Sequence, residues 1–175
     1  FYQLSQSCQI PRLAELYQMF LGFKPDGYFV EVGAYDGEYV SNTSGLADLG
    51  WRGLYIEPVT VYYELCIKRH QYNQVNVVQC AIGAEEKMVD ISVGGPLSSL
   101  SEETIAHFDS LNWAKGFHSG NKEMVKQCVL DDVLSNYQVP NQFDVLSIDV
   151  EGYESEVIKG FSINKWQPKL VIIEL

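Results

Sequence analysis

The chain has 175 residues and a net charge of −11, and 46% of its residues are hydrophobic while 20% are charged. This composition is typical of one folded domain over residues 1–175, and it excludes a disordered acidic tail and a collagen-like or low-complexity chain. The negative charge repels phosphate backbones and anionic lipid headgroups, so we expect neither nucleic acid nor a membrane surface as a partner.

The N-terminal region, residues 1–26, contains the first predicted element. Apolar residues at positions 13, 16, 17, 20 and 21 follow Pro11 and end near Gly22. That spacing predicts an amphipathic helix with all five residues on its apolar face.

Strands and helices then alternate along the chain. Short apolar runs at residues 28–32 and 53–57 predict buried strands, and a third strand is predicted over residues 75–80, ended by the Ala-Ile-Gly run at 81–83. A helix over residues 62–70 separates the second strand from the third. This rhythm predicts parallel βαβ units.

The middle of the chain is less regular. Residues 88–93 alternate like a strand, and residues 124–129 are predicted to pair with it. Residues 94–122 are predicted to form a loop-rich insertion or lid. Within them, Ser101 and the two acidic residues that follow it are suited to the beginning of a helix.

The C-terminal part returns to regular elements. It contains a predicted short helix at residues 130–137, the most apolar strand at 143–150, a helix at 154–159 and a last strand at 169–175. No internal repeat or linker is visible.

The cysteines and the apolar runs indicate the cellular compartment in which the protein is found. Cys8, Cys66, Cys80 and Cys128 form no C-x-x-C pair, which favours buried thiols under reducing conditions. No apolar run reaches the roughly 18 residues of a membrane helix, and the first twenty residues show no secretory leader. We therefore expect a soluble, cytoplasmic protein. Because the sequence begins with Phe and ends inside an apolar run, we also expect it to be a piece of a longer gene product.

A glycine-containing turn follows the first predicted strand. In open parallel sheets, ligands bind at the carboxyl ends of the strands. Here the turn holds Gly33 and Gly37, which permit unusual backbone angles and close approach of a ligand such as a ribose or a carboxylate. The spacing is not G-x-G-x-x-G, which disfavours NAD. The structural alternative is a plain tight turn.

An acidic residue ends the second predicted strand. Glu57 stands 24 residues after Gly33, a spacing at which a carboxylate accepts hydrogen bonds from both hydroxyls of an adenosine ribose. The structural alternative is a solvated charge in front of Pro58.

Five blocks occur in a fixed order along the chain: VEVGAYDG at 30–37, SNT at 41–43, GWRGLYIEP at 50–58, FDVLSIDVEGYE at 143–154 and PKLVIIE at 168–174. In these blocks the sequence resembles the FkbM-type S-adenosylmethionine-dependent methyltransferases. The blocks are specific together, although none is specific alone.

The resemblance implies an α/β fold with a Rossmann-like class I methyltransferase sheet, mostly parallel, with helices on both faces. It implies that the cofactor, S-adenosylmethionine, lies over the ends of the first four strands. Glu31 and Gly33 would border its methionine part, Glu57 would hold its ribose, and Ala81 with Ile82 would flank its adenine.

The resemblance also implies contacts from neighbouring segments. Ser41 and Asn42 would cap the following helix near the cofactor, and Tyr35 would either lie over the cofactor or only pack beside the turn. The whole cofactor-binding set predicted in this way consists of Glu31, Gly33, Tyr35, Asp36, Gly37, Ser41, Asn42, Glu57, Pro58, Ala81 and Ile82.

Two features depart from the family pattern. Ser147 stands where family members often carry Lys, so no role of that lysine is carried over. The fold normally continues past the strand that ends near Glu174 with a helix and two antiparallel strands, so we expect a sheet truncated before its last strands, with an open edge.

Methyl transfer needs an aligned acceptor and a group that takes the acceptor's proton. Asp149 and Glu151, our catalytic candidates, are two residues apart and share a face if the strand continues through them. They are suited to hold the cofactor's ammonium, deprotonate a hydroxyl or bind Mg²⁺; we favour positioning and predict no metal site. The structural alternative is that Asp149 caps a turn and Glu151 begins a helix.

The predicted lid holds His107 and His118 together with Trp113 and Phe117, which either contact the acceptor or supply the base, or face solvent. The histidines and cysteines lack the spacing of zinc ligands. Neither a G-x-S-x-G elbow nor a Walker lysine is present.

These patterns together predict an S-adenosylmethionine-dependent O-methyltransferase that acts on a hydroxyl of a small molecule such as a sugar or a polyketide. The acceptor class comes from the resemblance alone. The alternatives are a nucleotide-sugar or NAD-binding enzyme on the same sheet, and a catalytically inactive binding module. The oligomeric state is not indicated.

Overall fold

A five-stranded parallel sheet forms the centre of the molecule, which the computed structural model describes over residues 12–22 and 24–174. The strand order is β3-β2-β1-β7-β8, and every neighbouring pair is parallel. This confirms the predicted α/β class. The sheet strands are β1 (Tyr28–Val32), β2 (Arg52–Ile56), β3 (Val75–Val78), β7 (Val145–Ile148) and β8 (Leu170–Ile173).

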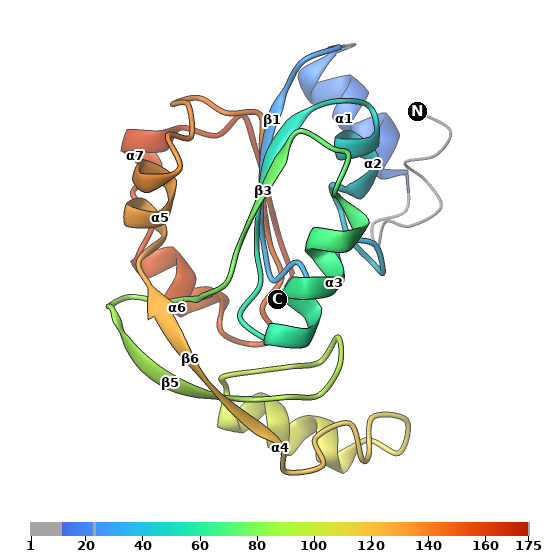
Figure 1. Cartoon of the computed structure of the whole chain (residues 1–175), viewed down its shortest axis with the longest axis vertical. Helices are drawn as coiled ribbons and strands as arrows, with labels where there is room; N and C mark the ends of the chain where they lie inside the picture. Colours follow the sequence, from blue (N-terminus) through green and yellow to red (C-terminus); the bar gives the residue numbers. More distant parts are fainter. Residues whose placement is uncertain (1–11, 23, 175) are drawn as a thin grey trace.

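Helices cover both faces of this sheet, as predicted (Figure 1). On one side lie α1 (Leu13–Leu21), α2 (Ser44–Asp48) and α3 (Thr60–Arg69), and on the other lie α5 (Leu130–Asn136), α6 (Glu154–Lys159) and α7 (Ile163–Trp166). Of these, α2 and α7 are too short for their periodicity to be read from the sequence.

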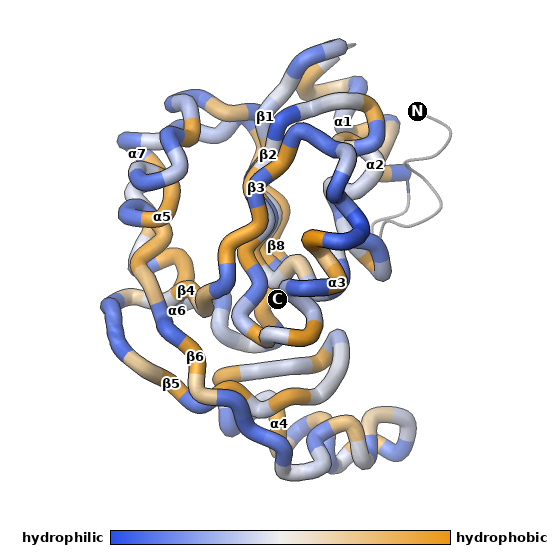
Figure 2. Tube along the Cα trace, viewed as in Figure 1, coloured by the Kyte–Doolittle hydropathy of each residue, from blue (hydrophilic) through white to orange (hydrophobic). Residues whose placement is uncertain are grey.

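Alternate residues of each strand belong to different cores. Val30 of β1 packs with the α5 and α6 side chains, whereas Phe29 packs with Leu13, Tyr17 and Leu46 from α1 and α2. A strand that is buried on both faces reads as a continuous apolar run, and all five residues of β1 are buried. Figure 2 shows hydrophobic stretches concentrated in the central strands.

A second, three-stranded sheet lies beyond the carboxyl ends of the main sheet (Figure 1). Its order is β4-β6-β5, with β4 (Ala81–Ile82) parallel and β5 (Lys87–Ser92) antiparallel to β6 (Lys122–Cys128). The predicted pairing of the two long strands is confirmed. The helix α4 (Glu102–Ser110) lies below this sheet, and the Ser101 hydroxyl accepts from the Thr104 amide at 3.2 Å, which confirms the predicted helix start.

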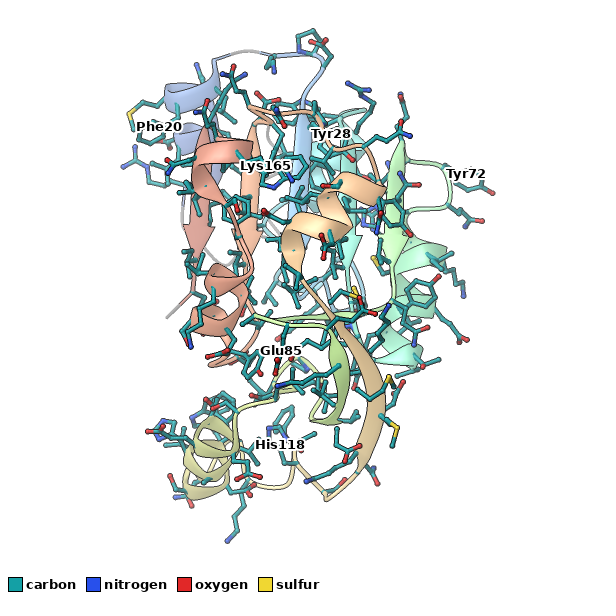
Figure 3. All side chains as sticks on the ribbon, turned by 90° about the vertical axis from the view of Figure 1, so that its left-hand side faces the viewer. Phe20, Tyr28, Tyr72, Glu85, His118 and Lys165 are labelled. Carbon is teal, nitrogen blue, oxygen red and sulfur yellow. The ribbon has the colours of Figure 1, made fainter. Side chains whose placement is uncertain are left out.

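Several predicted boundaries were wrong. The third strand ends at Val78, because the chain leaves the main sheet there and Ala81 pairs with Gln127 in the second sheet. Residues 80–82 stay buried between the two sheets, so hydrophobicity does not mark the change. Phe20 of α1 was expected on the apolar face, but 59% of its surface is exposed and Figure 3 shows it pointing outward.

Some predictions concern single residues or whole segments. Cys66 and Cys80 are buried thiols, as predicted, and Cys128 is half-buried. Cys8, Pro11 and the last position of the predicted final strand lie outside the described residues. No helix within residues 12–22 and 24–174 has both the length and the apolar character needed to cross a bilayer.

Candidate functional site

Two neighbouring pockets lie at the carboxyl ends of β1, β2 and β7. We call them the inner pocket, of about 60 Å³, and the outer pocket, of about 420 Å³. Val32, Ile56, Glu57, Pro58, Tyr62, Ala81 and Ile82 line the inner pocket, and Glu31, Tyr39, Ser41, Trp113, Phe117 and Glu174 line the outer one. Gly33, Tyr35, Pro96, Asp149 and Glu151 line both, so the two pockets adjoin.

Gly33 is needed where the ends of β1 and β7 pass each other. Its φ is +86°, and a Cβ built on it would lie 1.7 Å from the backbone oxygen of Asp149. No larger residue fits without moving one of the two strand ends. The prediction of a plain tight turn is therefore incomplete, because this glycine also sets how closely the two strand ends approach beside the pockets.

Glu57 is a buried carboxylate rather than a solvated one, with 5% of its surface exposed. Its Oε2 accepts from the Tyr35 amide at 2.9 Å and its Oε1 accepts from the Val59 amide at 2.8 Å. Burial raises the pKa of Glu57 to about 8, although the two amides lower it. Each carboxylate oxygen keeps a second acceptor position for a ligand hydroxyl.

Glu31 is still more enclosed, with 3% of its surface exposed. It accepts from the Ser41 hydroxyl at 2.8 Å, the Thr43 hydroxyl at 2.6 Å and the Asn42 amide at 3.0 Å. Burial raises its pKa, while these three hydrogen bonds oppose that effect. The carboxylate thereby ties β1 to the loop that precedes α2.

The two residues predicted to cap the next helix behave differently. The Ser41 hydroxyl accepts from the backbone amide of Ser44 in the first turn of α2, at 3.0 Å, as a cap would. The side chain of Asn42 instead donates to the Ser147 hydroxyl on β7, at 3.1 Å. The Asn42 side chain therefore links the loop before α2 to β7 and does not cap α2.

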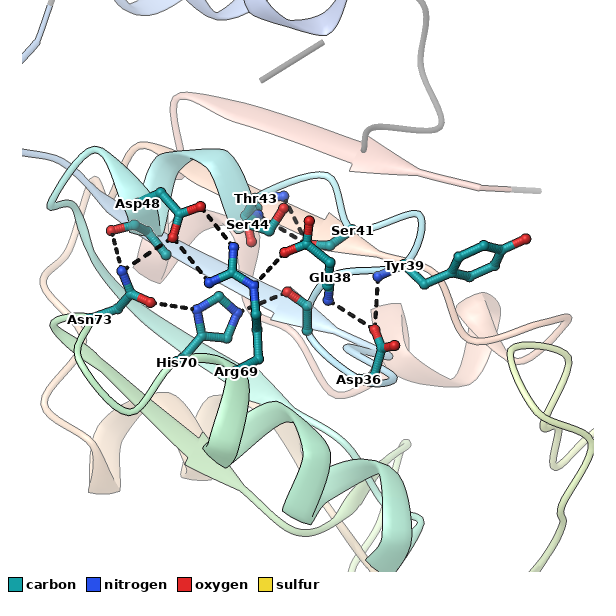
Figure 4. A network of polar contacts seen from close by, with 12 residues as sticks. Asp36, Glu38, Tyr39, Ser41, Thr43, Ser44, Asp48, Arg69, His70 and Asn73 are labelled. Carbon is teal, nitrogen blue, oxygen red and sulfur yellow. Dashed lines mark hydrogen bonds and ion pairs between the residues drawn. The ribbon is translucent and has the colours of Figure 1, made fainter. Parts of the chain in front are cut away.

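Figure 4 shows the polar network that holds the loop after β1. Arg69 forms ion pairs with Glu38 and with Asp48, and the His70 Nε2 lies 2.8 Å from the Gly37 carbonyl oxygen. Asp36 accepts from the Glu38 and Tyr39 amides within the loop itself.

Three residues of the predicted cofactor set therefore lie outside the lining of both pockets: Asp36, Gly37 and Asn42. The other eight line at least one pocket. Asp36 bonds within its own loop, whereas Gly37 and Asn42 contact His70 and Ser147, partners that the sequence does not show.

Asp149 and Glu151 do not share a strand face, because β7 ends at Ile148 and Glu151 has a φ of +52°. Both nevertheless line the two pockets. Burial and the negative charge of Glu174 together raise the pKa of Asp149 to about 8 and that of Glu151 to about 7.

The alternative reading of these two carboxylates is wrong in one respect. Glu154, not Glu151, lies at the beginning of α6, where its Oε1 accepts from the Val150 and Gly152 amides at 3.2 and 3.1 Å. Glu151 is thus left facing the pockets.

Glu174 is a site residue that our sequence reasoning missed. It follows β8 just as Glu57 follows β2 and Asp149 follows β7, and its amide donates to the Ile148 carbonyl oxygen at 3.1 Å. The rule that polar residues after parallel strands face the site would have found it.

Residues 95–100 cover the inner pocket. Ser99 fastens this segment, because its hydroxyl donates to the Glu151 carbonyl oxygen at 2.6 Å. A Cβ on Gly152 would lie 1.9 Å from the Thr104 Oγ1, so α4 packs directly on the same loop. The beginning of the predicted lid therefore packs beside the pockets.

Aromatic residues of this lid reach the site, whereas its histidines do not line either pocket. Trp113 and Phe117 line the outer pocket. The Nδ1 of His118 lies 2.9 Å from the Ser92 hydroxyl, and the ring stacks on Phe108 within the lower part of the molecule (Figure 3).

The lining of the inner pocket is suited to a nucleoside, and that of the adjoining outer pocket is suited to a positively charged group. Apolar Ala81 and Ile82 offer a surface for a purine, Glu57 offers acceptors for hydroxyl groups, and the carboxylates of the outer pocket favour positive charge. A volume of about 60 Å³ holds only a few water molecules, so a nucleoside needs more room than the inner pocket has in this structure. Within residues 12–22 and 24–174, we find no group of three or more His, Cys, Asp or Glu placed to hold a metal ion.

Comparison with known proteins bears on the same region. A family model described as "Methyltransferase FkbM domain" matches residues 31–175, which is most of the chain and includes every pocket residue named above. Neither the curated proteins nor the solved structures that we searched gave a match. The match confirms the resemblance seen in the five sequence blocks, and the chain belongs to the FkbM methyltransferase family.

Proposed function

We propose that this methyltransferase uses S-adenosylmethionine and transfers its methyl group to a hydroxyl of a small molecule such as a sugar or a polyketide. One observation supports the proposal above the others. Glu57, the predicted ribose ligand, and Gly33 line the same inner pocket, and the carboxylates of Asp149 and Glu151 lie where that pocket meets the outer one.

In this proposal the inner pocket binds the nucleoside. The second acceptor positions of the Glu57 oxygens take the two ribose hydroxyls, and Ala81 and Ile82 pack against the adenine. Glu31 and Gly33 border the methionine part, where a buried carboxylate balances positive charge. The bound cofactor supplies an electrophilic methyl group on a sulfonium.

The outer pocket then holds the acceptor. Glu151 or Asp149 orients its hydroxyl and accepts its proton, since both line the two pockets. A carboxyl group whose pKa is raised to about 7, as in Glu151, is better matched to proton transfer near neutral pH than an ordinary carboxylate.

We also propose a cytoplasmic location and a small-molecule acceptor as the partner. Buried reduced thiols at Cys66 and Cys80 support a reducing compartment. The net charge of −11 supports a partner other than nucleic acid.

Calorimetry with S-adenosylhomocysteine tests the cofactor assignment. We expect a Kd in the micromolar range, weakened at least about tenfold in Glu57→Gln, because the amide offers one acceptor oxygen where the carboxylate offers two. Glu64→Gln, which removes a charge from the exposed surface of α3, is the matched control and leaves binding unchanged.

A thermal-shift panel separates the alternatives. S-adenosylhomocysteine should raise the melting temperature, whereas NAD⁺ and a nucleotide sugar should not. Stabilisation by either of the latter two alone, or no binding of S-adenosylhomocysteine by the folded protein, overturns the proposal. Binding without methyl transfer to any acceptor library would instead identify an inactive binding module.

A further inference from the structure

The outer pocket has an unusual charge for an acceptor site. Its lining includes four carboxylates, Glu31, Asp149, Glu151 and Glu174, and among the described residues that line it none is Lys, Arg or His. Its volume of about 420 Å³ lies in the ordinary range of small-molecule pockets, about 300–1,000 Å³. A ligand in this pocket therefore meets negative charge with no compensating side chain in the wall.

The proposed cofactor neutralises only part of this charge. S-adenosylmethionine carries a sulfonium, an ammonium and a carboxylate, hence one net positive charge. Burial raises the pKa of Glu31, that of Glu151 to about 7 and that of Asp149 to about 8, so these buried groups carry only part of a full negative charge near pH 7. Glu174, whose side chain is exposed, and Glu151 line the pocket proposed for the acceptor, so negative charge remains on this part of the wall.

Another part of the lining is aromatic. Tyr39, Trp113 and Phe117 line the outer pocket, although 58%, 65% and 42% of their surfaces are exposed. They come from two separate segments, the loop after β1 and the lid, and Figure 4 shows the Tyr39 ring pointing away from the Arg69 network. Aromatic faces attract cations and stack on flat ligands.

Carboxylates and aromatic faces both favour a cation over an anion. We infer that the acceptor is a hydroxyl compound that carries a basic amine, and that phosphorylated and carboxylated compounds are excluded from the outer pocket. This inference rests on the proposed function, and it makes Glu174 a specificity-determining residue. A like-charged ligand placed beside the Glu174 and Glu151 carboxylates is repelled, whereas an ammonium is attracted.

Three probes of one shape test the inference. Tyramine, tyrosol and 4-hydroxyphenylacetate share a phenol ring and a two-carbon arm, and they differ chiefly in carrying a positive, no and a negative charge. We would measure their Kd values by ligand-observed NMR on protein saturated with S-adenosylhomocysteine. Tyramine should bind tightest and 4-hydroxyphenylacetate at least about tenfold more weakly than tyramine at low ionic strength.

Variants identify where the preference comes from. Glu174→Gln, at an exposed position, should reduce the ratio of the Kd of 4-hydroxyphenylacetate to the Kd of tyramine several-fold. Trp113→Ala should weaken the binding of tyramine. Glu64→Gln removes the same charge outside the pocket and should leave the ratio unchanged.

Equal or tighter binding of 4-hydroxyphenylacetate, an unchanged ratio in Glu174→Gln, or no binding of any probe overturns the inference. Binding of S-adenosylhomocysteine is measured first on the same sample, so that failure of the proposed function is seen separately from failure of this charge preference.

Discussion

At the scale of single residues, the candidate site depends on Glu31, a buried carboxylate that accepts three hydrogen bonds. Glu31 receives two hydroxyls and one backbone amide, all from residues 41–43. A buried charge is tolerated only when such donors replace the water it has lost. The donors are therefore as important to the fold as the carboxylate itself.

Thr43→Val tests this dependence. The substitution keeps the shape of the side chain but removes the hydroxyl that donates to Glu31 at 2.6 Å. We expect the free energy of unfolding to fall by about 1.5–3 kcal/mol, the usual value of a hydrogen bond to a charged group. Urea unfolding at neutral pH measures it.

Thr43→Ser keeps the hydroxyl and is the matched control, with a smaller loss that comes only from the missing methyl group. Equal stability of the valine variant and the wild type would show that Glu31 does not need this donor.

At the scale of elements, the site depends on how closely the ends of β1 and β7 approach. The two strands pair in parallel from Phe29 with Val145 to Val32 with Ile148. Beyond that register the Gly33 backbone passes the Asp149 carbonyl. This contact sets the width of the region where the two pockets meet.

Gly33→Ala should separate these strand ends. A Cβ 1.7 Å from a backbone oxygen forces one strand end to move, which costs about 1–3 kcal/mol beyond the strain of a left-handed backbone. We expect lower stability in urea and loss of S-adenosylhomocysteine binding by calorimetry.

Gly50→Ala is the control for backbone strain alone. Its φ of +90° is as positive, but nothing lies within 4 Å of the added Cβ. If both variants lose the same stability, the contact between the strand ends contributes nothing.

The elements also show why sequence boundaries were partly wrong. The sequence predicts one strand over residues 75–80, but β3 ends at Val78, and Ala81 and Ile82 form β4 of the second sheet. Cys80 is buried although it lies between the two strands, so its hydrophobicity does not mark the end of β3. Strand pairing changes there, and pairing is decided by partners distant in sequence.

At the scale of the whole molecule, the pKa values of different carboxyl groups are shifted in opposite directions. Burial raises the pKa of Asp144, but hydrogen bonds from Lys169, Lys24 and the Tyr28 amide outweigh it, so the net shift is downward. Glu57 and Glu151 are shifted upward, to about 8 and about 7. Stability should therefore decrease toward both acid and alkaline pH.

The sign follows from proton binding. Above about pH 4 the unfolded chain releases the protons of Glu57 and Glu151 while the folded chain keeps them, so stability falls as pH rises toward 7–8. Below about pH 4, protonation of Asp144 is favoured in the unfolded chain, so stability falls as pH decreases.

We therefore expect urea unfolding to give its highest free energy near pH 4 and a decline toward pH 8, at most about 1.4 kcal/mol per pH unit for each group. Glu151→Gln should stabilise the protein at pH 8 and have little effect at pH 4. A profile that rises between pH 5 and 8 would contradict this assignment.

The sequence by itself determined the sheet, the family and which acidic residues follow two of the buried strands. Continuous apolar runs identify strands buried on both faces, and Glu57 and Asp149 follow such strands, so their place at one edge of a parallel sheet was predictable. The five ordered blocks gave the family, which the match over residues 31–175 confirms.

The tertiary structure alone decided the rest. The loop that holds Gly37 is fixed from behind by Arg69, which pairs with Glu38, and by His70, which lies 2.8 Å from the Gly37 carbonyl oxygen. The pairing of β8 with β7 brings Glu174 to Asp149, whose pKa is raised mainly by burial and further by this neighbouring charge. Such contacts join residues far apart in the chain, and local patterns carry information only about neighbours and burial.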